Sequence, residues 1–504
     1  KNKSVRSSSG VLPISVATDG NNFSCAYDCH FCPNECTQLG AERDISRSYL
    51  SSEGTFIRGA IEDFDAARSI WRRLIQLEMM GHPPDKCEII VLGGTWDCYP
   101  SAYRDLFIQE IFYACNVYHL LSLRLEGPFS HHVKEFLAQK PFMKDIPFDK
   151  DGEIRKQLTP MRSLEEEKKF NETAPCGKII GIVLETRPDQ INRHSLLRKR
   201  VLGCTRIQLG IQSTNNEVLD FNNRGHTIEK SVQALHYARD ACFKVDGHLM
   251  PDLPSTTLEI DYKMVDDVFN GDDLQLDYCK LYPCLDLPYT KSREWKEEGV
   301  WKPIAENNYP AFLELMCHAM ASVPPWTRVN RVQRDFPEAQ EKNDYLGFVS
   351  ENIKSNLQEE VLRRLKETNR KCRDIRCREI RTQHHFDAYL SARLYIRCYR
   401  ANGGTEFFLT VEIPQPDGEV ADDATLIGLL RLRLPDSEAK RIKEMRGELP
   451  PGGAGDPPNH YLKEFRTRFL ARVRELHVYG NVRMVEGDKK KKQQKEKQKE
   501  KQKE

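Results

Sequence analysis

Residues 25–32 read CAYDCHFC and place Cys25, Cys29 and Cys32 in a CxxxCxxC pattern, shortly after the apolar run 11–17. The spacing lets three thiolates close around one face of a small cluster. A [4Fe–4S] cluster normally takes four protein thiolates, so three of them leave one iron open. An open iron can chelate a small molecule. The stretch therefore predicts a cluster-binding loop with a free coordination position.

A fourth cysteine, Cys36, leaves a second interpretation open, because four thiolates hold a structural zinc ion tetrahedrally. Ligand count and spacing favour the cluster over zinc at this point. A disulfide framework does not fit. The chain is long, lacks a secretory segment and scatters its other cysteines, as in proteins of reducing compartments.

The composition is that of a globular protein with two or three domains: 504 residues, 39% hydrophobic and 30% charged. A formal net charge of +1 gives no global field for nucleic acid, so any such binding must come from local patches. No apolar stretch approaches the roughly 20 residues that cross a bilayer. We expect no membrane association and a cytoplasmic location.

The first two-thirds of the chain alternates short apolar runs with segments of helical periodicity. This alternation predicts an α/β fold, with a parallel sheet and crossover helices that form a partial or full barrel. Loops at the carboxyl ends of such strands carry the chemistry. The expected strands are 11–17, 88–92, 178–185, 205–211, 244–250 and 277–282.

Polar residues follow several of these strands. Gly93, Gly94 and Thr95 come directly after one strand, where glycines allow close approach of a ligand to the backbone. Charged and amide side chains at the next two strand ends can bind hydroxyl and carboxylate groups. These are Glu185 and Arg187 on one strand, and Gln208 and Gln212 on the next.

Beyond residue 389 the runs 395–399, 406–412, 424–434 and 473–479 predict antiparallel strands of a second domain. We expect a residual segment at 1–10, a barrel at 11–335, a helical linker at 336–388 and a partial α+β domain at 389–487. Residues 488–504 are almost entirely Lys, Gln and Glu, and predict a disordered tail.

The chain resembles the family of the Elongator catalytic subunit, which joins a radical-SAM barrel to an acetyltransferase-like GNAT domain. The matching stretches occur in family order and cover most of the chain. They are GGTW at 93, ETRPD at 185, GCTRIQLGIQS at 203, NRGHT at 223, HLMPDLP at 248, KLYP at 280, PPWTRVNRVQRD at 324, LIGLLRLR at 426 and RELHVYG at 474.

The resemblance implies a radical-SAM enzyme that forms a carboxymethyl precursor at carbon 5 of the wobble uridine of tRNA. It implies a 4Fe–4S cluster on Cys25, Cys29 and Cys32, together with S-adenosylmethionine and acetyl-CoA. Lys280 and Tyr282 are candidates for contact with acetyl-CoA or substrate, or else ordinary barrel lining. The implied partners are tRNA and either other Elongator-type subunits or further copies of the chain, in the cytoplasm and also the nucleus. The alternatives are a protein (histone) lysine acetyltransferase and a non-catalytic tRNA-binding scaffold.

Two further stretches hold candidate binding residues. Residues 324–335 interleave Trp326 with arginines, which suits stacked bases and phosphates, or else a basic loop packed on its own domain. Cys372 and Cys377 are candidate zinc ligands in which Asp374 replaces a cysteine found in some family members, and His384 or His385 is a candidate further ligand.

The sequence departs from the family in two places. The gap between Cys25 and Cys29 is shorter than in many nuclear members, which predicts a divergent branch. After RELHVYG no glycine-rich loop that would cradle the pyrophosphate of acetyl-CoA is present before the tail. The chain also begins at Lys1 rather than methionine. We therefore expect a fragment or a shortened branch, truncated at both ends, with an incomplete acetyl-CoA site.

Overall fold

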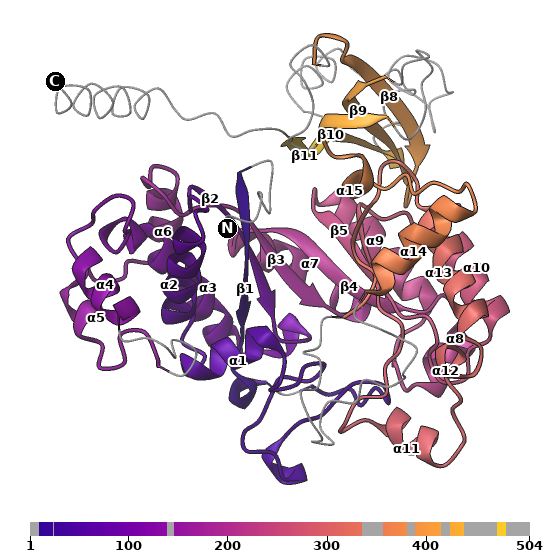
Figure 1. Cartoon of the computed structure of the whole chain (residues 1–504), viewed down its shortest axis with the longest axis horizontal. Helices are drawn as coiled ribbons and strands as arrows, with labels where there is room; N and C mark the ends of the chain where they lie inside the picture. Colours follow the sequence, from indigo (N-terminus) through magenta and orange to yellow (C-terminus); the bar gives the residue numbers. More distant parts are fainter. Residues whose placement is uncertain are drawn as a thin grey trace, which may run out of the picture.

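Seven parallel strands form one curved sheet in which neighbours in the sheet are neighbours in the chain. The computed structural model describes residues 10–23, 25–138, 146–334, 356–380, 389–414, 424–437 and 471–479 (Figure 1). The strands are β1 (Val11–Ala17), β2 (Lys86–Leu92), β3 (Lys178–Thr186), β4 (Cys204–Gln212), β5 (Lys244–Leu249), β6 (Tyr278–Leu281) and β7 (Arg328–Arg331). Sequential order with same-handed crossovers curls the sheet into a half-barrel with helices on its outer face.

Several helices on the outer face begin at polar caps, and the helices bury their apolar sides. Asp65 caps α2 by accepting a hydrogen bond from the Arg68 amide, and Trp71 on that helix is fully buried. The longer helices are α2 (Ala66–Met79), α3 (Ser101–Val117), α7 (Arg193–Val201), α9 (Ile228–Asp240), α10 (Leu258–Phe269) and α13 (Tyr309–Ser322). The shorter ones are α1 (Gly54–Ile61), α4 (Ser130–Ala138), α5 (Glu153–Gln157), α6 (Leu164–Asn171), α8 (Asn216–Phe221), α11 (Lys291–Glu297), α12 (Ile304–Asn307), α14 (Leu357–Glu367) and α15 (Ile375–Arg378).

The two faces of the half-barrel differ because side chains alternate along each strand. On β2, Cys87 and Ile89 are completely buried in the core beneath the helices. Glu88 and Ile90 face the opposite way and line a cavity on the concave side. The apolar half of each strand thus builds the core, and the other half is free for chemistry.

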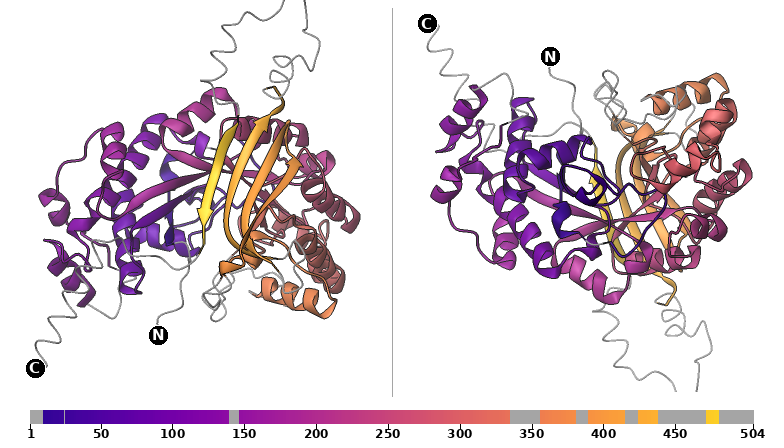
Figure 2. Two further views of the ribbon diagram at one scale, coloured as in Figure 1. Left: turned by 90° about the horizontal axis from the view of Figure 1, so that it is seen from above. Right: turned by 90° about the horizontal axis from the view of Figure 1, so that it is seen from below.

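A separate sheet of four antiparallel strands lies across the amino end of the half-barrel (Figures 1 and 2). Its order is β11-β10-β9-β8. The strands are β8 (Arg393–Arg400), β9 (Gly404–Ile413), β10 (Thr425–Pro435) and β11 (Arg472–Val478). Its charged face is the buried one, with Glu406 and Arg433 almost fully enclosed, whereas Ile396 and Leu476 on the other face are exposed. The buried face thus combines charged side chains with an apolar cluster that includes Phe408, Leu426 and Leu429.

The contact between the sheets centres on Asp277, directly before β6. Its carboxylate accepts from Arg474 of β11 at 2.6 and 2.8 Å, and Arg239 of α9 lies 3.2 Å away. Glu406 of β9 also accepts from Arg474, at 2.8 Å. Burial acts to raise the pKa of Asp277, but Arg239, Arg474 and Arg431 outweigh it and hold that pKa far below its usual range.

Most of the expected architecture is confirmed: a half-barrel of parallel strands followed by a separate antiparallel sheet. The parallel sheet has one strand more than expected, because residues 328–331 form β7 and pair with β6. Between β2 and β3, α6 packs on α3, and Asn116 donates to the buried Glu167 at 2.6 Å. The tail at 488–504 lies outside the described residues. The domain limits stay predictions.

None of the helices in the described part of the chain is long and apolar enough to span a lipid bilayer.

We expect Asp277→Asn to lower the free energy of unfolding by about 3–5 kcal/mol, because it leaves buried guanidinium groups without their shared carboxylate. Urea denaturation followed by circular dichroism measures the change. Asp436→Asn is the matched control, since its pair with Arg400 is half-exposed, and we expect a change of less than about 1 kcal/mol there. Equal effects at the two sites would contradict the central role of the buried network.

Candidate active site at the cysteine loop

The cysteine loop follows β1 and crosses the carboxyl end of the half-barrel to reach loops on its far side. The His30 amide donates to the Asn222 carbonyl and the Asn34 amide to the Tyr289 carbonyl, both at 3.0 Å. The Asn223 side-chain amide donates to the Asp28 carbonyl at 2.8 Å. These bonds anchor the loop over the strand ends, where barrel enzymes carry their chemistry.

Two guanidinium groups from different elements meet at the sulfur of Cys29. Arg187, directly after β3, donates from Nη1 to Cys29 Sγ at 3.3 Å. Arg224, in the loop after α8, donates from Nη1 to the same sulfur at 3.4 Å. Cys29 and both arginines are buried. Two buried cations aimed at one sulfur suit a negatively charged thiolate, the form that binds metal.

The other two cysteines of the loop lie in different environments. A hydrogen bond with Cys98 is the main cause that lowers the pKa of Cys25 to about 6, and Arg47 and Arg187 lower it further against the effect of burial. Burial raises the pKa of Cys32 to about 11. The Cys32 sulfur lies 3.1 Å from Ser48 Oγ and lines the cavity. Cys32 therefore marks the boundary between loop and cavity.

The spacing of the thiols separates the two interpretations of the loop. In the part of the chain that the structure describes, one group of three or more metal-ligating side chains has its ligand atoms within 4.8 Å of one another, and this group lies elsewhere. Cys25, Cys29, Cys32 and Cys36 are therefore spaced too widely for one zinc ion at Zn–S distances of about 2.3 Å. A cluster places each thiolate on a separate iron and does not require such close sulfurs, so the cluster stays the prediction for this loop.

Gly93 and Gly94 are required by the packing of the protein itself. A Cβ on Gly93 would lie 1.7 Å from Thr18 Oγ1, and one on Gly94 would lie 2.6 Å from the Arg47 carbonyl oxygen. Gly94 also has φ of +73°, which favours glycine. Thr95 follows as a buried residue. The glycines let β2 turn tightly beneath the cysteine loop, and their proposed contact with a cofactor stays a prediction.

A cavity of about 1650 Å³ follows the concave face along the strands. Its carboxyl end is lined by Cys32 and Tyr49 of the cysteine-loop region, and its amino end by residues 474–479 of β11 and its exit. The strands between supply charged and amide side chains to the wall. The cavity thus connects the cysteine loop with the second sheet through the interior of the half-barrel.

Glu185, Lys280 and Tyr282 all line this cavity. Tyr49 donates its hydroxyl to Glu185 Oε2 at 2.5 Å, and burial raises the pKa of Glu185. Burial lowers the pKa of Lys280 to about 8, although the carboxylates of Asp246 and Glu185 oppose it. Among the described residues the Lys280 ammonium has no hydrogen-bond partner and lies 5.7 Å from the Tyr282 ring centroid. The structure thus brings a cation and a phenol together in the cavity.

Gln208 and Gln212 of β4 also line the cavity, and each has a buried side-chain oxygen without a hydrogen-bond partner among the described residues. Gln208 donates to Asp246 Oδ2 at 3.1 Å. Gln212 has φ of +73°, a strained value for a residue with a side chain. Unpaired buried polar groups cost free energy, so the site is suited to a polar ligand.

Asp246 and His248 on β5 were not among the predicted site residues. Asp246 Oδ1 and His248 Nε2 are buried without partners among the described residues, and His248 lines the cavity. Burial holds the pKa of His248 well below its usual value. The alternation of polar residues along residues 244–249 was the signal that could have identified them.

Arg187 is not among the residues that line the cavity, because its side chain is turned to the cysteine loop.

Residues 324–335 were expected to contact bases, and several of their side chains make contacts within the protein. Trp326 stacks on Tyr399 with centroids 4.1 Å apart, and Arg328 pairs with Glu379. Arg334 pairs with Glu53 at 2.6 Å. Arg328, Arg331 and Arg334 also line the cavity, so contact of this segment with bases stays a prediction.

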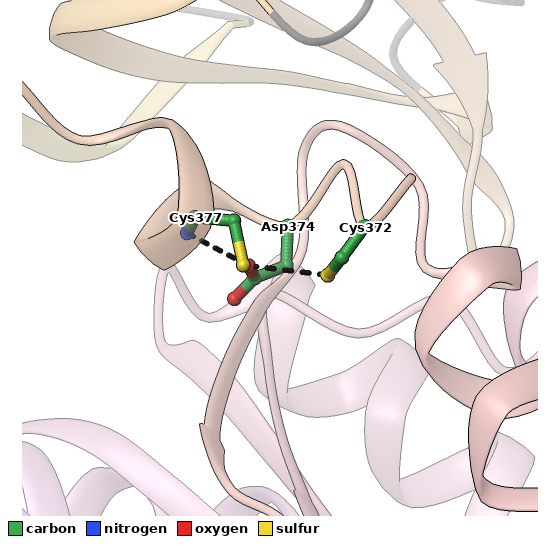
Figure 3. Close-up of side chains that lie close together, drawn as sticks. All are labelled: Cys372, Asp374 and Cys377. Atoms are coloured by element: carbon green, nitrogen blue, oxygen red, sulfur yellow. Dashed lines mark hydrogen bonds between the residues drawn. The ribbon is translucent and has the colours of Figure 1, made fainter. Parts of the chain in front are cut away.

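The compact group of metal-ligating side chains is Cys372, Asp374 and Cys377 (Figure 3). Asp374 is buried and caps α15 by accepting from the amides of Cys377 at 2.8 Å and Arg376 at 3.3 Å. The Val329 amide and the Cys372 thiol also donate to this carboxylate. The carboxylate oxygens of Asp374 thus have hydrogen-bond partners without a metal ion. His384 and His385 lie outside the described residues.

Comparison with known proteins places this geometry in context. The family model described as "Radical SAM superfamily" matches residues 156–260. The chain is 31% identical over 485 residues to "tRNA uridine(34) acetyltransferase" of Methanocaldococcus infernus, covering 95% of this chain and 75% of the relative. It is 33% identical over 494 residues to "Elongator complex protein 3" of Homo sapiens, covering 96% and 74%. The solved structure of M. infernus Elp3 with residues 1–46 deleted matches with a TM-score of 0.63 and 28% identity, covering 95% of this chain and 85% of that one.

We expect Lys280 to react with acetic anhydride with a pH midpoint near 8, because burial lowers its pKa. About one-tenth of such a group is neutral at pH 7, against about 0.04% of an ordinary lysine. Peptide mass spectrometry of briefly labelled protein measures the rates, with the surface residue Lys156 as control. Asp246→Asn removes an opposing carboxylate and should move the midpoint lower. A midpoint near 10 in the unsubstituted protein would contradict the assignment.

Proposed function

Because this chain belongs to the family of Elongator complex protein 3 and the tRNA uridine(34) acetyltransferases, we propose that it is a radical-SAM enzyme that modifies carbon 5 of the wobble uridine of tRNA. The modification that we propose is acetyl-CoA-dependent carboxymethylation. The observation that carries the proposal is the position of the cysteine loop. It covers the carboxyl end of a parallel half-barrel and opens through Cys32 into an interior cavity.

The residues of the loop fit a [4Fe–4S] cluster held by Cys25, Cys29 and Cys32. The support is the pair of guanidinium groups at the sulfur of Cys29, together with the absence from the described residues of a compact ligand group for zinc in this loop. When bound, the cluster and S-adenosylmethionine would supply the radical chemistry. Gly93, Gly94 and Thr95 turn the chain beside this loop and are our candidates for the wall of the S-adenosylmethionine site.

The polar cavity residues would bind and orient the other reactants. Gln208 and Gln212 offer unpaired amide oxygens to hydroxyl or N–H groups. Lys280 is mostly protonated at pH 7 with a pKa of about 8, so its ammonium would hold a carbonyl or anionic oxygen. Tyr282 and Glu185 flank it in the same cavity. Enclosure by the strands would fix the geometry of the reactants and limit the access of water.

We place acetyl-CoA at the amino end of the cavity, where β11 forms the wall. The support is continuity, because the same cavity contacts the second sheet and the cysteine loop. The substrate would be tRNA, with other Elongator-type subunits or further copies of this chain as partners, in the cytoplasm and also the nucleus. Protein lysine acetylation is less well supported, because it gives no role to the cysteine loop or to the polar lining.

We also propose that Cys372 and Cys377 hold zinc. The support is that their sulfurs and a carboxylate oxygen of Asp374 lie within 4.8 Å of one another. Because Asp374 already accepts from backbone amides, the remaining zinc ligands would come from elsewhere in the protein.

The first test is anaerobic reconstitution with iron and sulfide, followed by dithionite and S-adenosylmethionine. We expect 5′-deoxyadenosine from the unsubstituted protein and background levels from Cys29→Ser, which removes a cluster ligand. Cys36→Ser is the matched control in the same loop and should retain product formation. Loss of product in Cys36→Ser together with bound zinc would contradict the proposed cluster.

Adding tRNA and acetyl-CoA, followed by nucleoside mass spectrometry, tests the proposed substrate. Formation of 5′-deoxyadenosine without modified uridine would refute the proposed substrate but not the cluster.

The zinc proposal has its own measurement. We expect elemental analysis of the purified protein to give about one zinc per chain. The double variant Cys372→Ser, Cys377→Ser should lose it, while iron after reconstitution stays unchanged. Protein that is folded and free of zinc after purification in zinc-supplemented buffer would contradict the site.

A further inference from the structure

We propose that Arg187 and Arg224 are positioning residues that set the reduction potential of the cluster through the sulfur of Cys29. This inference rests on the proposed function, because it requires a cluster on the cysteine loop. The two Nη1 atoms lie 3.3 and 3.4 Å from that sulfur, and the side chains come from separate parts of the half-barrel. Neither arginine lines the cavity, so their role is distinct from substrate binding.

Arg187 is held rigidly in this position. Its Nε donates to Asp189 Oδ1 at 2.9 Å, and a second nitrogen donates to the Arg224 carbonyl. Its guanidinium lies 3.5 Å from the centroid of the Tyr27 ring, within the cysteine loop. Gly225 leaves room for it, since a Cβ there would lie 3.3 Å from Arg187 Nη2. The side chain therefore has one arrangement available, and that arrangement points at Cys29.

Arg224 is fixed by an equally specific set of contacts. Its Nη2 donates to the Gly210 carbonyl at 2.6 Å, and its Nε donates to His226 Nε2 at 3.1 Å. Burial, with Arg224 and Arg187, lowers the pKa of His226 to about 4, so the imidazole is neutral at pH 7 and accepts this bond. A Cβ on Gly210 would lie 2.6 Å from Arg224 Nη2. The strand β4 thus requires glycine there for Arg224 to reach the loop.

The charges around Cys29 are unbalanced without a negative sulfur. Two guanidinium groups face one carboxylate, Asp189, in a buried environment. N–H···S bonds and nearby positive charge lower the electron density on the sulfur and favour the reduced form of an iron–sulfur cluster. Together the arginines should make the cluster easier to reduce, which is the state that acts on S-adenosylmethionine in the proposed function.

The test is a redox titration of reconstituted protein followed by electron paramagnetic resonance, without S-adenosylmethionine. Arg187→Gln and Arg224→Gln should each shift the midpoint potential to more negative values, and the double variant should shift it further. Arg187→Lys and Arg224→Lys keep the charge but lose the planar fork, so their shifts should have the same sign and be smaller. If the Gln variants retain no iron, the Lys variants carry the comparison.

Asn223→Gly is the matched control. Asn223 also supports the loop, but its uncharged side chain donates to the Asp28 carbonyl rather than to sulfur. We expect this variant to reduce iron retention with a smaller change in potential. Unchanged potentials in fully loaded arginine variants, or an equal shift in Asn223→Gly, would overturn the inference. Absence of any cluster in the unsubstituted protein would instead refute the proposed function.

Discussion

A buried network of carboxylates and guanidinium groups joins the two sheets, and the wall of the cavity at its amino end depends on it. Asp277 stands at the amino end of β6, and Arg474 of β11 bridges it to Glu406 of β9. Burying these charges is costly unless each is paired. The pairing therefore fixes how the antiparallel sheet lies on the half-barrel. This placement brings β11 to the cavity and gives the interior a wall at its amino end.

Buried charges also meet near the opposite end of the cavity, but their balance is different there. At the sheet contact the charges compensate one another, whereas at Cys29 two buried cations exceed the carboxylate that accompanies them. In the first arrangement each guanidinium has a carboxylate partner within the protein. The second needs a negative sulfur, which is how a thiolate bound to metal presents itself. Stability and chemistry are thus separated along the length of the half-barrel.

The regular part of the fold could be predicted because it follows from periodicity. Six parallel strands and four antiparallel strands come from runs that are readable in the sequence. The strand β7 was missed because residues 328–331, Arg-Val-Asn-Arg, form no apolar run; Asn330 faces the cavity and Val329 alone enters the core. Motif spacing likewise identified the cysteine loop, whereas Asp277 and Arg474 are too far apart in sequence for any pattern to pair them.

The residue types of the site were predictable from the sequence, but the directions in which their side chains point were not. Glu185 and Arg187 end the same strand, and the alternation of side chains would send both to one face. The strand ends at Thr186, however, so Arg187 lies beyond the region where alternation holds and turns to Cys29. Glu185 remains within the strand and faces the cavity. One residue of strand length thus separates a side chain that faces the cavity from one that supports the cysteine loop.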